Sequence, residues 1–130
     1  MAVASFSSII EQLGKRDGHL AAITCSDDSI TRRQLDLDTN RLARAYLNLG
    51  VKEGDLVTVA LPNSIEFIKA CIAIWKIGAT PQPVSSRLPR NEMDSIISLA
   101  KPSLVIGTDA DSLNDLKSVP IGFVPSEELS

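Results

Sequence analysis

The chain has 130 residues, of which 44% are hydrophobic and 22% are charged, and its formal net charge is −3. This length supports one domain with a buried core, and the composition is typical of a soluble globular protein. Acidic and basic residues are interspersed, so the chain lacks the clustered cations that a nucleic-acid surface requires.

Two cysteines, Cys25 and Cys71, and the single His19 have no metal-ligand spacing. We expect both cysteines to be reduced, buried thiols of a cytoplasmic protein. No apolar run reaches the roughly 18 residues that a membrane span needs. The N-terminus also lacks the basic and apolar regions of a signal peptide.

The N-terminal part predicts a helix followed by a hairpin. Ser5 to Leu13 has apolar residues at helical spacing, and we expect Gly14 to end this helix. The run from Leu20 to Cys25 is a predicted strand. It is expected to pair with a second short strand at Ser29-Ile30.

A longer helix is predicted from Thr31 to about Leu49. Thr31 is a good N-cap, and Gln34 stands three residues later, as in a capping box. One side of the helix is apolar, with Leu35, Leu42, Tyr46 and Leu49. We assign the other side to Arg33, Asp36, Thr39, Asn40 and Arg44.

A strand from Leu56 to Leu61 precedes a nearly all-apolar helix, which Asn63 or Ser64 caps and Gly78 ends. The charged residues of this helix share one narrow stripe: Glu66, Lys69 and Lys76. We expect the rest of its circumference to be buried, which requires more partner surface than a small domain readily supplies.

The segment from Ala79 to Val84 reads as an edge strand, because Pro81 and Pro83 each remove a backbone donor. Pro89 is the expected first residue of the next helix, whose apolar face comprises Met93, Ile96, Ile97 and Ala100.

Leu104 to Ile106 is a further predicted strand. Residues 107–130 are weakly defined, with a short helix over 109–116 and an extended piece from Ile121 to Val124. Alternating strands and helices predict an α/β fold, a mostly parallel sheet with helices on both faces. The chain closes on a polar segment, as expected of a piece of a longer protein.

The residues by themselves supply no catalytic set. There is no glycine-rich phosphate loop and no nucleophile–histidine arrangement, since His19 stands beside a predicted turn. Asp27-Asp28 and Glu127-Glu128 are adjacent carboxylates, which point to opposite sides of an extended chain and make poor acid–base pairs.

Three pieces between Ile30 and Ile106 resemble, in order, the start of the adenylate-forming acyl ligases. This family comprises acyl- and aryl-CoA synthetases, luciferases and the adenylation domains of peptide synthetases. The pieces are ITRRQL leading into DTNRLARAYLNLGVKEGD, the unit LVTVALPNSIEFIKACIAIWKIGA, and the segment WKIGATPQPVSSRL. They are similar to the family's Thr-Tyr-x-x-Leu helix start, its Pro-Asn-Ser unit and its Leu-Lys-x-Gly-Ala…Arg-Leu segment.

The resemblance implies a single α/β subdomain over residues 1–130, the first subdomain of a longer ligase. In the family, ATP and Mg²⁺ activate a carboxylic acid as an acyl-adenylate, and a thiol, usually coenzyme A, then takes the acyl group. The family's phosphate loop, nucleotide contacts, acyl pocket and catalytic lysine lie downstream of the matched pieces. We therefore expect no catalytic residue and no metal ligand in this chain, which should be inert alone. Its expected partners are a small carboxylic acid and the rest of the ligase, not nucleic acid or a membrane.

Arg87 is the one residue to which the resemblance assigns a ligand. It matches the arginine of the family's Arg-Leu pair, which in some acyl-CoA ligases lies at the coenzyme A entrance near the nucleotide phosphates. A guanidinium suits that role as a permanent charge with a fork of donors. The alternative is a structural arginine at the sheet edge. Arg90 is a weaker candidate, and we expect Phe67 and Trp75 in the core.

Departures from the family pattern bear on which thiol accepts the acyl group. Pro81-Gln82 stands where Tyr-Val is usual, Ser85-Ser86 where Asp/Asn-Pro is usual, and Arg32 replaces an aromatic residue. The Tyr-Val-Pro-Leu-Asp form is commoner in amino-acid adenylation domains, so its loss favours a CoA ligase of a fatty, aromatic or polycyclic acid. The alternative is a free-standing α/β binding or interaction module without catalysis.

Overall fold

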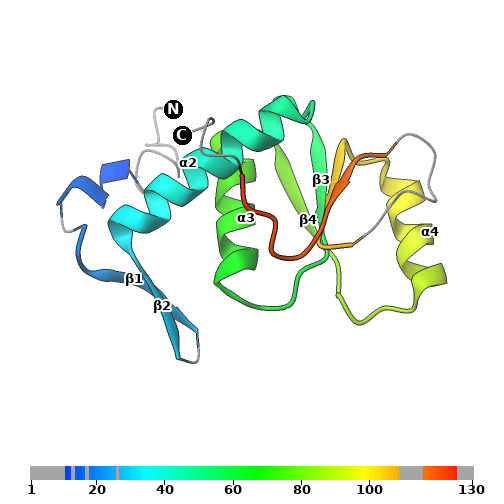
Figure 1. Cartoon of the computed structure of the whole chain (residues 1–130). Helices are drawn as coiled ribbons and strands as arrows, with labels where there is room; N and C mark the ends of the chain where they lie inside the picture. The colour runs from blue at the N-terminus through cyan, green and yellow to red at the C-terminus, as the bar shows by residue number, and fades with distance from the viewer. Residues whose placement is uncertain (1–10, 13, 17, 26, 109–115, 126–130) are drawn as a thin grey trace, which may run out of the picture.

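A computed structural model describes residues 11–12, 14–16, 18–25, 27–108 and 116–125 (Figure 1). Its elements in chain order are β1 (Ala21–Cys25), β2 (Asp28–Thr31), α2 (Arg32–Asn48), β3 (Leu56–Val59), α3 (Ile65–Lys76), β4 (Thr80–Pro83), α4 (Arg90–Ala100), β5 (Leu104–Ile106) and β6 (Ser118–Val119). Most of the predicted N-terminal helix lies outside the described residues. Its expected end at Gly14 is wrong, because residues 14–16 are helical.

The main sheet has four parallel strands in the order β4-β3-β5-β6, as the alternation of strands and helices predicts. Strand β4 lies at its edge and pairs with β3 alone. The amides of Thr80 and Val84 donate to the carbonyls of Asp55 and Val59, at 2.8 and 2.9 Å. Pro81 and Pro83 alternate with these donors, so no ladder hydrogen bond is lost. The predicted edge strand is confirmed.

Helices cover both faces of this sheet. On one face, β3 and β5 pack Val57, Val59, Leu104 and Ile106 against a core that includes Ala73 and Ile74 of α3. On the other face, Met93 and Ile97 of α4 pack against Ala60 and Val105. The opposite placement follows from the strand period of two, which turns Val105 away from its neighbours Leu104 and Ile106. The predicted layer arrangement is confirmed (Figure 1).

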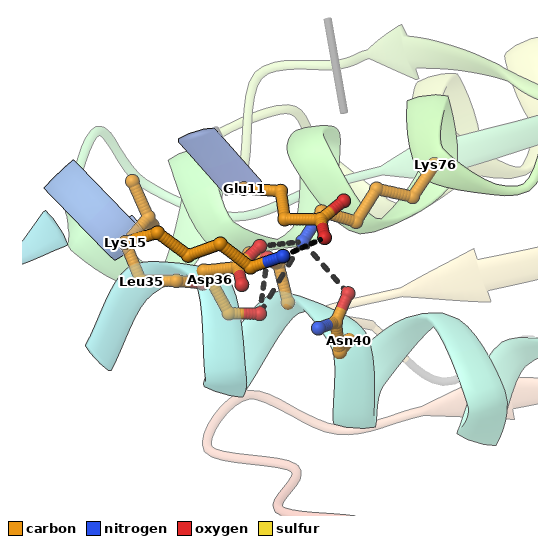
Figure 2. A network of polar contacts seen from close by, with 7 residues as sticks. Glu11, Lys15, Leu35, Asp36, Asn40 and Lys76 are labelled. Carbon is orange, nitrogen blue, oxygen red and sulfur yellow. Dashed lines mark hydrogen bonds and ion pairs between the residues drawn. The ribbon is translucent and has the colours of Figure 1, made fainter. Parts of the chain in front are cut away.

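The charged stripe of α3 faces α2. Lys76 Nζ lies 2.9 Å from both Asp36 Oδ1 and Asn40 Oδ1, and 3.3 Å from the Asp36 carbonyl (Figure 2). Lys69 forms a second ion pair with Asp38, at 3.0 Å. The outward side that we assigned to α2 is therefore partly wrong. Asp36 and Asn40 turn toward Lys76, and Thr39 is fully buried with its hydroxyl donating to the Leu35 carbonyl at 2.7 Å.

Part of the apolar remainder of α3 finds its partners inside the chain. Ile72 packs with Ile30 of the β1–β2 hairpin and Leu35 of α2, and Ile23, Ile65 and Ile68 join them as partly buried neighbours. The hairpin and α2 thus cover part of the apolar surface of α3, and the expectation of a further partner outside this chain stays a prediction. Trp75 is also misplaced by the sequence prediction, because it is 47% exposed.

Other boundaries shift by small amounts. Both N-caps are confirmed, since Thr31 Oγ1 accepts from the Gln34 amide and Ser64 Oγ from the Phe67 amide, each at 3.1 Å. Pro89 is the N-cap of α4 and not its first helical residue. The extended piece expected from Ile121 to Val124 is wrong, because the last strand is β6 and a turn follows it.

The remaining expectations concern residues 109–116, the cysteines and the membrane. The helix predicted over 109–116 falls almost entirely outside the described residues. Cys71 is buried, where burial raises the pKa of its thiol, whereas Cys25 is only partly buried. Within the described ranges, no helix has both the length and the apolar stretch needed to cross a membrane.

Candidate functional site

A groove of about 610 Å³ lies where β3 and β4 end. Its lining combines the segment after β3 with the segment after β4: Leu61, Pro62, Asn63, Phe67, Pro83, Val84, Ser85, Ser86 and Arg87. Because parallel strands place their carboxyl ends at one edge of the sheet, two segments more than twenty residues apart form one site. In α/β proteins this edge is where ligands usually bind.

Among the described residues that line this groove, Arg87 is the one that is charged. Its side chain is exposed, and it has no ion pair or hydrogen bond with another residue in the part of the chain that the structure describes. Asn63, Ser85 and Ser86 add uncharged polar groups, and Phe67 provides an apolar wall. A permanent cation with free donors, beside hydroxyl and amide groups, can hold a phosphate or carboxylate.

Backbone contacts hold the segment that carries Arg87. The Val84 amide continues the ladder onto the Val59 carbonyl, and a turn follows in which the Leu88 amide donates to the Ser85 carbonyl at 3.3 Å. The Arg87 amide donates to Ser85 Oγ, also at 3.3 Å. The guanidinium is thus left to the groove while its backbone is fixed.

Arg90, the weaker candidate, does not line the groove. Its Nε lies 3.0 Å from Asp94 Oδ1, and one terminal nitrogen donates to Thr108 Oγ1 at 2.9 Å. Its role in the described structure is a link between α4 and the segment after β5.

The two residues that the sequence offers as the N-cap of α3, Asn63 and Ser64, have separate roles. Ser64 Oγ accepts from the Phe67 amide and donates to the Pro62 carbonyl at 2.9 Å, so Ser64 is the cap. Asn63 is exposed in the groove, a position that the sequence analysis treated as a possible cap. Phe67 is partly buried against the core and also lines the groove, so the expectation of core packing is only part of its role. The available signal was the position of Asn63 in the segment that follows the predicted strand from Leu56 to Leu61.

A smaller cavity of about 210 Å³ lies between α2, α3 and the C-terminal segment 123–125. The charges at its rim are largely used within the chain. Lys69 is paired with Asp38, and a Glu66 oxygen accepts the Gly122 amide at 2.6 Å. Burial raises the pKa of Tyr46, which also lines this cavity, and the nearby Glu66 adds to the effect. Arg41 also lines this cavity, but so do the carboxylates of Asp38 and Glu66, whereas no described carboxylate lines the groove at Arg87. The groove is therefore the better candidate for an anionic ligand.

Acid–base or metal chemistry has little basis in these residues. The described lining of the groove has hydroxyls and an amide but no histidine, cysteine or carboxylate beside them. Among the described residues, no group of His, Cys, Asp and Glu side chains could hold a metal ion. The arrangement can bind and orient an anion.

The doubly covered parallel sheet and the groove at its carboxyl edge, which carries Arg87, define an α/β protein with a candidate site for an anion. The model of the AMP-binding enzyme family matches residues 10–126, and the chain belongs to this family.

Two relatives agree with this assignment. The chain is 34% identical over 101 residues to a dimodular nonribosomal peptide synthase of Bacillus subtilis, covering 76% of this chain and 4% of that protein. It is 33% identical over 94 residues to the crotonobetaine/carnitine–CoA ligase of Escherichia coli, covering 68% and 18%. The chain thus spans less than a fifth of either relative.

The fold is that of the N-terminal subdomain of Klebsiella oxytoca NpsA, solved in complex with 3-hydroxybenzoyl-AMSN. The TM-score is 0.77 at 24% identity, covering 91% of this chain and 30% of that chain. The fold class predicted from the sequence is confirmed.

Proposed function

We propose that this chain is the N-terminal part of a cytoplasmic, ATP-dependent ligase that joins a carboxylic acid to coenzyme A through an acyl-adenylate. Membership of the AMP-binding enzyme family supports adenylate formation. The observation that carries the assignment is Arg87, whose guanidinium has no partner among the described residues and lines a groove at the carboxyl edge of the parallel sheet.

Arg87 binds a phosphate group of coenzyme A in this proposal. Phosphates carry the charge that a guanidinium fork recognises, and Asn63, Ser85 and Ser86 add hydrogen-bonding groups around it. When ATP and Mg²⁺ are bound, they supply the activation of the acid. No described residue of this chain is assigned to the metal, and no residue is assigned to proton transfer. The 130 residues are inert alone and position one substrate.

The remainder of the ligase packs on this subdomain in the proposal. Leu99 on α4 is 85% exposed and Val124 is 80% exposed. Large apolar side chains this exposed gain stability when another part of a protein covers them. The covering part brings the nucleotide-binding elements toward the groove.

The acceptor is the point that most needs a test, because relatives include a peptide synthase as well as a CoA ligase. The absence of the Tyr-Val-Pro-Leu-Asp form favours coenzyme A. The full-length enzyme should form the thioester with coenzyme A. Transfer only to the thiol of a carrier protein would instead favour the peptide-synthetase function.

Arg87→Ala in the full-length enzyme tests the role of the groove. We expect the KM for coenzyme A to rise about tenfold, because a charge-assisted hydrogen bond contributes about 1.5–3 kcal/mol. Pyrophosphate release in the adenylation half-reaction should stay unchanged. Lys52→Ala is the control, because Lys52 is an exposed cation that precedes β3, at the end opposite the groove. Equal losses in both half-reactions would mean that Arg87 is structural.

A further inference from the structure

Arg90 connects the two segments that flank the end of β3. It is the first residue of α4, three residues after Arg87, and one of its terminal nitrogens donates to Thr108 Oγ1 at 2.9 Å. Strand β3 lies between β4 and β5, so this contact ties the connection after β4 to the segment after β5.

The Thr108 end of this link is firmly placed. Gly107 has φ +95°, and a side-chain Cβ added there would lie 2.6 Å from the Ala60 carbonyl oxygen. The Gly107 amide also donates to the Val119 carbonyl at 2.8 Å, and the Ala60 amide to the Ile106 carbonyl at 2.8 Å. The backbone before Thr108 is therefore packed directly on the end of β3 and cannot move independently.

The other end of the link fixes Arg90 itself. Its Nε lies 3.0 Å from Asp94 Oδ1, an oxygen that is buried and has no aligned hydrogen-bond donor among the described residues. Arg90 therefore supplies the cation that faces this oxygen, and the pair spans one turn of α4. A planar guanidinium can face a carboxylate and a hydroxyl at once, whereas a lysine ammonium on its flexible stem cannot reproduce that fork.

We propose that Arg90, through Thr108 and Asp94, is a positioning residue that holds the Arg87 segment at the rim of the groove. This inference rests on the proposed binding role of Arg87 and names the contacts that hold Arg87 in place for it. The other constraints on the segment from Val84 to Leu88 lie mainly at its two ends: the ladder bond and packing of Val84, the turn and the Arg87 amide bond at Ser85, and the partial burial of Leu88. Without the link, the segment can move while the sheet stays intact.

The test is Thr108→Val in the full-length protein, which removes the acceptor hydroxyl and nearly preserves the shape. Thr108→Ser is the matched control, because it keeps the hydroxyl. We expect the KM for coenzyme A to rise about fivefold in Thr108→Val, with kcat unchanged, and to stay near the wild-type value in Thr108→Ser. In a double-mutant cycle, Thr108→Val should add nothing to Arg87→Ala, since the residue that it positions is gone. Arg90→Lys should reproduce the Thr108→Val phenotype.

Amide hydrogen exchange supplies a readout that is independent of activity. Thr108→Val should speed exchange in residues 85–93 at least about fivefold, while the amides of β3 and α3 stay protected. The positioning role is overturned if Thr108→Val exchanges like Thr108→Ser, or if its KM effect persists in full on the Arg87→Ala background. If Arg87→Ala leaves the KM unchanged, the proposed coenzyme A contact is wrong. The exchange comparison alone then decides whether Arg90 orders the segment.

Discussion

The ion pair between α2 and α3 gives the most precise stability prediction. Lys76 contacts two acceptors of Asp36 and one of Asn40, and its side chain is 7% exposed beside an Asp36 side chain that is 16% exposed. Lys76→Met keeps the apolar stem but leaves the Asp36 carboxylate without its cation. Breaking a buried pair costs about 3–5 kcal/mol. Because Asp36 keeps some contact with solvent, we expect a loss of about 2–3 kcal/mol.

Urea denaturation of the chain measures this loss. For a slope of about 1–3 kcal/mol per molar urea, the midpoint should fall by about 0.7–3 M. Lys15→Met is the control, because Lys15 and Glu11 form an exposed ion pair, at 76% and 54% exposure, and its loss should leave the midpoint in place. Lys76→Met combined with Asp36→Leu should recover part of the stability, since neither charge is then left buried alone. A Lys76→Met midpoint equal to that of Lys15→Met would refute the reasoning.

Two further predictions concern backbone strain and pH. Gly107→Ala should lower the free energy of unfolding by about 3 kcal/mol, because a left-handed backbone costs an L-residue about 1–2 kcal/mol and the contact with the Ala60 carbonyl adds to it. Gly54→Ala is strained at φ +84° but meets no atom within 4 Å, so it should cost clearly less, and equal losses would contradict the steric argument. Burial, reinforced by Glu66, raises the pKa of Tyr46 above its ordinary value of 10.0. The stability from a neutral Tyr46 is therefore complete below that pH and declines as the pH rises further. Tyr46 is the only tyrosine of the chain, so tyrosinate absorbance should appear together with loss of helical circular dichroism, and ionisation near its ordinary pKa in a folded chain would contradict this.

Local features were predictable because their causes are local. The caps at Thr31 and Ser64 depend on a hydroxyl and an amide three residues apart. The edge position of β4 follows from its two prolines, which cannot donate to a second neighbour. The errors at Gly14 and Pro89 concern the exact ends of helices, where sequence signals are weakest.

The candidate site was only partly predictable. Arg87 came from the resemblance to the ligase family, but its groove needs Asn63 and Phe67, which precede it by about twenty residues. Only the parallel pairing of β3 with β4 brings these segments to one edge. The fold gives Arg90 two partners, Asp94 and Thr108. The position of Arg90 in the sequence, three residues after Arg87, could not show whether it binds a ligand or positions Arg87.

The sequence by itself determined the alternation of strands and helices, the caps, the edge strand and the family resemblance, because propensity and hydrophobic period act over a few residues. The tertiary structure decided which side of each helix meets which neighbour. The three charged residues of α3 read as a polar stripe, yet Lys69 and Lys76 face carboxylates of α2. The apolar residues of α3 divide between the core beside the sheet and a second cluster with α2 and the β1–β2 hairpin. Such pairing depends on distances between segments far apart in the chain, and periodicity within one segment carries no information about them.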